Sequence, residues 1–190
     1  RDGSMSLMVA CADAVFEAHR GLIAALSSRV FRIGDRPGDG ARTKLGLDPA
    51  KPVLLITGGS QGASSMNQLM LAMLAQQRDA FAGWQVLHQT GKDAPESALR
   101  DAYAAAGVTA IVTPFVDGLG VWWNAATLAL ARSGAGNVAE VWANRVPAIF
   151  MPYPYHKDQH QKINAKTLVA AGGAIVHTDH IDAATNVKDA

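Results

Sequence analysis

Short apolar runs alternate with longer amphipathic segments along most of this 190-residue chain. Six of the apolar runs predict buried strands, at residues 53–57, 85–89, 109–113, 128–131, 148–151 and 174–177. The segments between them predict helices at residues 66–77, 96–106, 118–125, 138–143 and 160–171. Strands that alternate with helices in this way pair in parallel, so we expect an α/β fold with a Rossmann-like, doubly wound parallel sheet.

The first part of the chain follows a different pattern. Residues 14–18 and 29–33 predict two short strands around a helix, whereas residues 34–41 are rich in glycine and polar residues, which is typical of a linker. We therefore expect three parts: a remnant of a preceding N-terminal domain at residues 1–34, a linker at residues 35–52, and the main domain at residues 53–190.

Composition narrows the class of protein. Apolar residues make up 49% of the chain, which is ample for a core, and the formal net charge is +1. The lysines and arginines are scattered, whereas a nucleic-acid-binding protein needs a basic stripe, so we expect no nucleic-acid partner. The single cysteine, Cys11, allows no internal disulfide and fits a reducing compartment. No apolar run approaches the roughly 18–20 residues of a membrane span.

Two glycine-rich segments follow predicted strands, at residues 58–63 and 132–140. Doubly wound sheets bind ligands beyond the carboxyl ends of their strands. Glycine lets the backbone approach a ligand there, and the free N–H groups of a starting helix favour phosphate. Residues 58–63 lack the Lys-Ser/Thr of a P-loop and the G-x-G-x-x-G pattern, which argues against ATP and NAD. A tight turn that needs glycine is the alternative explanation for this segment.

Glu140, three residues after Asn137, admits two interpretations. The spacing matches a capping box, in which the carboxylate folds back onto the start of its own helix. Alternatively, the carboxylate accepts hydrogen bonds from the ribose hydroxyls of a nucleotide. The second interpretation fits a phosphate site at the same helix start.

The polar run at residues 156–161 also has more than one explanation. His156 and His160 are four residues apart with an acid between them, a spacing that suggests a metal site. Prolines and tyrosines precede the run, so we do not expect His156 on the helix, and we favour a sugar-binding cluster over a metal. A solvated helix start capped by Asp158 is the structural alternative.

Two further segments suggest structural roles. Residues 88–92 end the strand predicted at 85–89, and their structural interpretation is a surface loop with a glycine turn. Trp122 and Trp123 predict core packing rather than a stacking platform. No serine, histidine and aspartate have the spacing of a nucleophile elbow, so hydrolase chemistry finds no support.

Taken in order, several segments resemble the C-terminal half of the MurG-type glycosyltransferases: residues 58–63, 88–92, 115–117, 132–135 with Glu140, and 147–161 with 164–165. The resemblance covers about residues 53–177, with a weaker likeness at 12–34. It implies the GT-B fold, in which two Rossmann-like domains face a cleft. It also implies inverting transfer of N-acetylglucosamine from UDP-N-acetylglucosamine to undecaprenyl-diphosphate muramoyl-pentapeptide in peptidoglycan synthesis, with no metal and no cofactor.

The resemblance also implies a set of donor-binding residues. The backbone of Phe115 and Val116 would receive the uracil, and Glu140 would bind the ribose hydroxyls. The remaining residues would surround the diphosphate and the sugar: Ser60, Gln61, Ala135, Gly136 and Asn137 for the first, and His160, Gln161 and Asn164 for the second.

Other parts of the family pattern are missing. Nothing matches the family's N-terminal domain, which carries the proposed base, and residues 34–38 match the interdomain Gly-Asn-Pro-x-Arg segment only in part. The chain also stops short of the family's usual C-terminal helices. We therefore assign no catalytic base and expect this chain alone to be inactive. The polyprenyl-diphosphate-linked acceptor and the membrane would be contacted only through the missing domain, with the parent enzyme on the cytoplasmic face of the cell membrane.

Three alternatives stay open. The parent enzyme could use another lipid acceptor, which a donor-binding half does not distinguish. The chain could be the donor-binding subunit of a split glycosyltransferase. A sugar-nucleotide epimerase of the same two-domain architecture fits the motifs less well.

Overall fold

The computed structural model describes residues 6–10, 12–21, 25, 29–34, 36–59, 64–92, 94, 96–155 and 160–188. The chain divides into two compact units, Arg1–Lys51 and Pro52–Ala190. The predicted boundary between linker and main domain lies next to this division.

The larger unit contains a parallel sheet with the strand order β5-β4-β3-β6-β7-β8. The strands are β3 (Val53–Thr57), β4 (Gln85–Gln89), β5 (Thr109–Thr113), β6 (Leu128–Ala131), β7 (Ala148–Phe150) and β8 (Ala174–Val176). The predicted strands are confirmed, with β7 and β8 each ending one residue earlier than expected. The chain runs outward from β3 to β5 and then returns to β6, so the direction of winding changes between β3 and β6.

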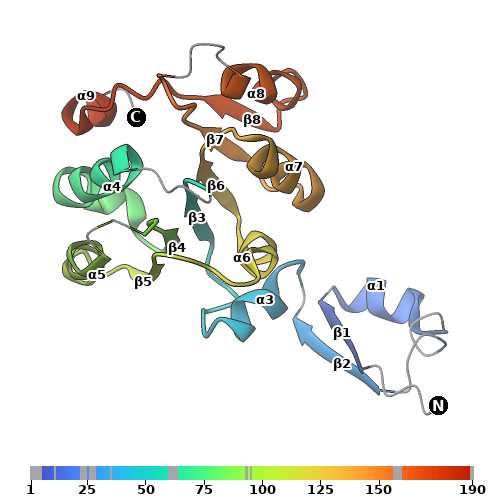
Figure 1. Cartoon of the computed structure of the whole chain (residues 1–190). Coiled ribbons are helices and arrows are strands. Elements are labelled where there is room, and N and C mark those ends of the chain that lie inside the picture. The colour runs from blue at the N-terminus through green and yellow to red at the C-terminus, as the bar shows by residue number, and fades with distance from the viewer. Residues whose placement is uncertain are drawn as a thin grey trace. The chain divides into compact units, whose positions relative to one another are not determined.

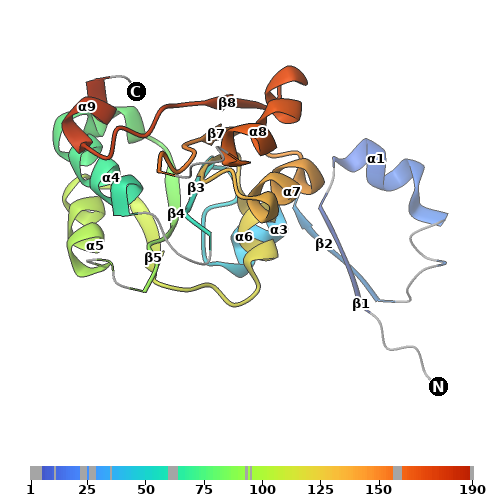
Figure 2. The same ribbon diagram turned by 45° about the horizontal axis from the view of Figure 1, so that its top comes forward.

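Helices cover both faces of this sheet (Figures 1 and 2). Helices α4 (Ser64–Gln76), α5 (Glu96–Ala105) and α9 (Ala183–Lys188) lie on one face, with the 3-10 helix η1 (Arg78–Phe81) after α4. Helices α6 (Leu119–Ala125), α7 (Ala135–Asn144) and α8 (His160–Ala170) lie on the other. This arrangement confirms the predicted doubly wound fold.

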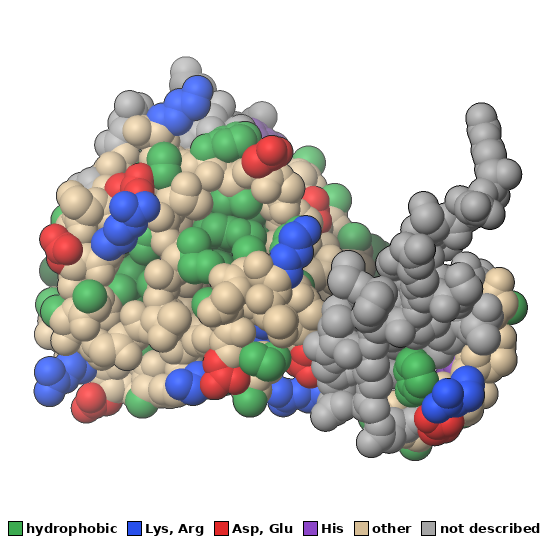
Figure 3. All heavy atoms as spheres, turned by 90° about the horizontal axis from the view of Figure 1, so that it is seen from below, with side chains coloured by type: hydrophobic (Ala, Val, Ile, Leu, Met, Phe, Trp, Pro, Cys, Tyr) green, Lys and Arg blue, Asp and Glu red, His purple; other side chains and the backbone are tan. Residues whose placement is uncertain are grey.

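The central strands are apolar on both faces because helices cover both of them. Val53, Leu55, Val86, Leu87 and Ala129 are all 0% exposed. Trp122 and Trp123 are also buried, which confirms their predicted core packing. On the face drawn in Figure 3, acidic and basic side chains of the larger unit are interspersed rather than gathered into one charged patch.

In its described residues, the smaller unit contains the parallel strands β1 (Ser6–Ala10) and β2 (Arg29–Gly34) and the helices α1 (Asp13–Ala18) and α3 (Asp39–Lys44). The strand predicted at residues 29–33 is confirmed, but the one predicted at 14–18 is wrong, since this segment lies in α1. A short apolar run does not by itself distinguish a strand from a helix. Parallel pairing of β1 with β2 requires a crossover, and α1 lies in that crossover.

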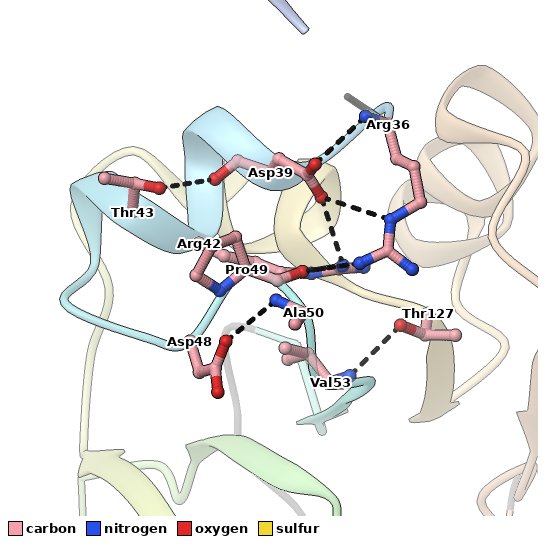
Figure 4. A network of polar contacts seen from close by, with 9 residues as sticks. All are labelled: Arg36, Asp39, Arg42, Thr43, Asp48, Pro49, Ala50, Val53 and Thr127. Atoms are coloured by element: carbon pink, nitrogen blue, oxygen red, sulfur yellow. Dashed lines mark hydrogen bonds and ion pairs between the residues drawn. The ribbon is translucent and has the colours of Figure 1, made fainter. Parts of the chain in front are cut away.

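Residues 36–50, inside the expected linker, have a defined structure (Figure 4). The carboxylate of Asp39 accepts a hydrogen bond from the Arg36 N–H at 3.0 Å and lies 3.6 Å from Arg42 Nη1. Both guanidinium groups also donate to the carbonyl oxygen of Pro49, at 3.0 and 3.1 Å. These contacts fix α3 against the turn that follows it.

Candidate functional site

A pocket of about 470 Å³ opens at the carboxyl ends of β3 and β6, where the winding of the sheet changes direction. Doubly wound sheets bind their ligands at this place. The pocket is lined by residues that follow β3 and β6 and by residues of α6, α7 and α8: Gly58, Gly59, Leu119, Arg132, Gly134, Gly136, Asn137, Glu140, His160 and Gln161.

Helix α7 begins at Ala135, with Gly134 as its N-cap in an extended conformation. The sequence predicted this helix only from residue 138, because the two glycines disfavour a helical conformation. No side chain caps the helix, so the first-turn N–H groups of residues 135–137 are directed outward without intrahelical partners. Such a terminus carries partial positive charge and favours an anion.

The side chain of Asn137 turns back rather than capping the helix. Its Nδ2 donates to the carbonyl oxygen of Arg132 at 2.9 Å, and the residue is 8% exposed. Asn137 is the third residue of α7, so the capping-box interpretation of Asn137 and Glu140 is wrong. The hydrogen bond closes the loop between β6 and α7 and fixes the position of the helix start.

The Glu140 carboxylate also points along its helix, toward its C-terminal end. Its Oε2 accepts a hydrogen bond from Asn144 Nδ2 at 3.0 Å, and the same nitrogen donates to the Glu140 carbonyl oxygen at 2.9 Å. Glu140 is half-buried and lines the pocket. The pocket at the anion-favouring helix start therefore also contains a carboxylate from the same helix.

A relay of two hydrogen bonds, from Gln89 through Thr57 to Gly59, fixes the segment after β3. Thr57 Oγ1 donates to Gln89 Oε1 at 2.7 Å and accepts a hydrogen bond from the Gly59 N–H at 3.1 Å. Gly59 has φ +77°, and a Cβ there would lie 3.8 Å from Asn137 Nδ2. The two glycine-rich segments therefore meet at the pocket. The predicted residues Ser60 and Gln61 lie outside the described residues.

Helix α8, which packs beside α7, brings further polar side chains to the pocket. His160 and Gln161 line the pocket, and Gln161 Oε1 accepts a hydrogen bond from the Tyr153 N–H at 2.9 Å. Asn164 Nδ2 donates to the Ser133 carbonyl oxygen at 3.2 Å and so joins α8 to the segment after β6. His156 and Asp158 lie outside the described residues.

The structure thus brings together five of the predicted site residues in the pocket lining: Gly136, Asn137, Glu140, His160 and Gln161. Phe115, Val116, Ala135 and Asn164 are not among the lining residues. Phe115 lies after β5 and is 63% exposed, and its carbonyl oxygen accepts a hydrogen bond from Thr113 Oγ1 at 2.9 Å. In the part of the chain that the structure describes, no group of three or more His, Cys, Asp and Glu side chains is arranged to hold a metal ion.

Sequence reasoning missed Arg132, which lines the pocket and is 6% exposed. Its Nη1 lies 2.7 Å from Asp179 Oδ2, in an ion pair whose side chains are 7% and 0% exposed. The sequence does show a charged residue directly after a buried strand, which indicates that Arg132 lies near the ligand-binding edge of the sheet. Its ion-pair partner Asp179 follows two further strands in the sequence, so no local pattern could have identified the pair.

His88 is buried, so the surface loop predicted at residues 88–92 is wrong. Its Nδ1 lies 2.9 Å from Tyr103 Oη, and its Nε2 lies 2.9 Å from Asn67 Oδ1. Asn67 Nδ2 donates to the carbonyl oxygen of Thr90, so Asn67 Oδ1 accepts and His88 Nε2 carries the proton. Burial lowers the pKa of His88 to about 3. The imidazole is therefore a neutral link between β4 and two helices.

Known proteins resemble this chain over the larger unit. Residues 53–188 match the model of the glycosyltransferase family 28 C-terminal domain. The chain is 42% identical over 143 residues to the UDP-N-acetylglucosamine–N-acetylmuramyl-(pentapeptide) pyrophosphoryl-undecaprenol N-acetylglucosamine transferase of Thermobifida fusca (strain YX), a match that covers 73% of this chain and 35% of the relative. It is 43% identical over 143 residues to the protein of the same name from Paenarthrobacter aurescens (strain TC1), covering 73% and 36%. The chain thus matches about a third of the length of these relatives.

Solved structures show the same fold. MurG of Acinetobacter baumannii superposes with a TM-score of 0.62 and 25% identity, over 89% of this chain and 52% of that one. The glycosyltransferase of kitacinnamycin superposes with a TM-score of 0.51 and 23% identity, over 80% of this chain and 37% of that one.

No helix among the described residues combines the length and apolar character that a membrane span requires. Since the family model covers most of its length, the chain belongs to the glycosyltransferase family 28 C-terminal domain family.

Proposed function

We propose that the larger unit binds UDP-N-acetylglucosamine, as the donor domain of an inverting glycosyltransferase that transfers N-acetylglucosamine to undecaprenyl-diphosphate muramoyl-pentapeptide in peptidoglycan synthesis. One observation carries the proposal. A single pocket is lined by an uncapped helix start, by a carboxylate further along the same helix, and by two polar side chains of the neighbouring helix α8. These groups match the diphosphate, the ribose and the sugar of a nucleotide sugar.

The start of α7 would bind the diphosphate, through the backbone at Ala135, Gly136 and Asn137. Ser60 and Gln61, which the family resemblance assigns to the diphosphate, would contact the same phosphates. UDP is the leaving group of the reaction, so negative charge grows on its phosphates as the glycosidic bond breaks. A preorganised helix terminus stabilises that charge without a metal ion.

Glu140 would accept hydrogen bonds from the ribose hydroxyls, and the backbone at Phe115 and Val116 would receive the uracil. His160 and Gln161 would contact the sugar, since they line the same pocket from α8. Asn164 would act indirectly, because its side chain holds the Ser133 carbonyl oxygen.

Residues 1–34 would belong to the N-terminal domain of the parent enzyme and residues 35–52 to the connection between the domains. The base that deprotonates the acceptor hydroxyl, the acceptor site and the membrane contact would all lie in that N-terminal domain. The parent enzyme would then work on the cytoplasmic face of the membrane.

Calorimetric titration of the chain with UDP-N-acetylglucosamine, UDP-glucose, UDP and ADP-glucose tests the proposal. We expect binding of the uridine nucleotides and little binding of ADP-glucose; equal affinity for all four would contradict the proposal. Glu140→Ala should weaken UDP binding far more than it lowers the melting temperature. Glu96→Ala is a matched control, because Glu96 also pairs with a residue one turn further along its helix, Arg100, but lies outside the pocket lining.

A further inference from the structure

Arg132 and Asp179 form their ion pair inside the larger unit, beside the pocket. Arg132 directly follows β6, and Asp179 lies in the segment between β8 and α9. The pair therefore joins the middle of the sheet to the segment that follows its edge strand. Both side chains lie beyond the carboxyl ends of their strands, which is the side on which the pocket opens.

Several other groups fix the Arg132 guanidinium. Its Nη1 donates to the Met151 carbonyl oxygen at 2.7 Å, and its Nη2 donates to Ser65 Oγ at 2.8 Å. The Ser65 hydroxyl donates in turn to Asp179 Oδ2 at 2.6 Å. The Tyr153 ring centroid lies 5.6 Å from Cζ of the guanidinium. A planar guanidinium with partners on these sides is held in one orientation.

Further hydrogen bonds fix the carboxylate of Asp179, the ion-pair partner of Arg132. Its Oδ1 accepts hydrogen bonds from the Ile181 N–H at 2.8 Å and from Asn186 Nδ2 at 3.3 Å. Burial alone favours the neutral acid, but the hydrogen bonds from Ser65 and Ile181 and the charge of Arg132 outweigh it and lower the pKa of Asp179. Helix α9 packs against α4, which carries Ser65 (Figures 1 and 2).

The two residues of the ion pair differ in whether they line the pocket. Arg132 is among the residues that line the pocket, whereas Asp179 is not, and the aspartate side chain is 0% exposed. Of the two residues of the pair, only Arg132 therefore contributes to the pocket wall. A buried ion pair adds little net stability, because desolvation offsets the attraction, so stability alone does not explain a charge pair at this place. A cationic residue in a pocket wall favours an anion in the pocket, and more strongly in a partly desolvated site.

We propose that Arg132 is a further binding residue for the diphosphate of the donor, and that Asp179 and Ser65 position its guanidinium. This inference rests on the proposed function, since it requires a nucleotide diphosphate in the pocket. Arg132 adds its charge to the partial positive charge of the α7 start. The same phosphates then lie near two independent sources of positive potential, which suits a leaving group that gains charge.

Titration of the full chain with UDP and with uridine tests this inference, because only UDP carries phosphates. The double variant Arg132→Met with Asp179→Asn removes both charges and leaves no unpaired charge in the interior. We expect it to weaken UDP binding about tenfold or more, as for the loss of a charge-assisted contact, and to leave uridine binding unchanged. Arg132→Lys keeps the charge and should bind UDP more tightly than the double variant. A melting curve for each variant confirms folding.

Ser65→Ala tests the positioning role separately, with the exposed Ser97→Ala as its matched control on α5. Ser65→Ala should weaken UDP binding several-fold with no change in uridine binding, and Ser97→Ala should change neither. An unchanged ratio of UDP affinity to uridine affinity in the double variant would overturn the inference. A wild-type chain that binds no UDP would instead contradict the proposed function itself.

Discussion

Asn144 holds the carboxylate of Glu140 from one turn further along α7. A single amide nitrogen, Nδ2, donates to Glu140 Oε2 at 3.0 Å and to the Glu140 carbonyl oxygen at 2.9 Å. The bond to the carbonyl fixes the amide, and the amide then restricts the carboxylate to one orientation. In the proposed complex, that orientation determines whether the carboxylate meets the ribose hydroxyls.

Asn144→Ala should therefore reduce the discrimination between UDP and 2′-deoxy-UDP. Freeing the Glu140 side chain adds the cost of ordering it on binding, which corresponds to a loss of about twofold to tenfold in UDP affinity. The deoxy nucleotide lacks a hydroxyl that the carboxylate would bind, so its affinity should change less. Calorimetry with both nucleotides measures the ratio.

A matched control lies on α6, where Asn124 Nδ2 donates to the Gly120 carbonyl oxygen at 3.1 Å with the same four-residue spacing. Asn124→Ala removes an equivalent helix-end hydrogen bond without touching a carboxylate. If both variants lower the UDP affinity equally, or if the UDP to deoxy-UDP ratio does not move in Asn144→Ala, the positioning role of Asn144 is wrong.

The buried His88 predicts a loss of stability in mild acid. In the folded chain its pKa is lowered to about 3, whereas the unfolded chain takes up a proton near the ordinary value of 6.5. The unfolded state therefore binds more protons between these two pH values. The contribution of His88 to stability is complete above pH 6.5 and falls as the pH drops toward 3. This amounts to about 2 kcal/mol between pH 7 and pH 5.

Urea denaturation at a series of pH values measures this dependence. His88→Gln keeps a polar side chain between Tyr103 and Asn67 but does not titrate, so its stability should be lower at pH 7 and nearly constant down to pH 5. The exposed His19→Gln should retain the wild-type pH dependence. A wild-type chain whose denaturation midpoint is the same at pH 7 and pH 5 would contradict this account of His88.

The strands and the fold class could be predicted from the sequence because short apolar segments alternate with helical ones and end at polar or glycine-rich residues. Contacts between elements that are distant in the sequence could not be predicted. His88 lies near the end of β4, where the sequence turns polar and looks like the start of a loop, but Tyr103 and Asn67 on two helices satisfy both of its ring nitrogens. The start of α7 was placed too late because the conformation of Gly134 and the bond from Asn137 to Arg132, rather than helix propensity, determine where the helix begins.

Arg145 ends α7 with φ 54° and ψ 34°, a left-handed conformation that strains any residue with a Cβ. Arg145→Gly should therefore raise the free energy of unfolding by about 1 kcal/mol and the melting temperature by about 2–4 °C. Arg145→Ala is the control, because it removes the same long side chain but keeps the Cβ. Thermal denaturation of the two variants separates relief of backbone strain from loss of side-chain packing. Equal melting temperatures would show that the strain is absent.

The relay from Gln89 through Thr57 to Gly59 predicts that a buried hydroxyl affects nucleotide binding from outside the pocket. Thr57→Val removes the hydroxyl at nearly constant volume, so the Gly59 N–H and the Gln89 side chain each lose a partner. We expect this variant to be about 1–3 kcal/mol less stable, because a buried polar group is left unpaired. It should also bind UDP more weakly, because Gly59 is then free to leave the left-handed conformation that brings it beside Asn137. Thr57→Ser keeps the hydroxyl while losing a methyl group. The relay therefore predicts tighter UDP binding by Thr57→Ser than by Thr57→Val, and equal UDP affinities in the two variants would refute it.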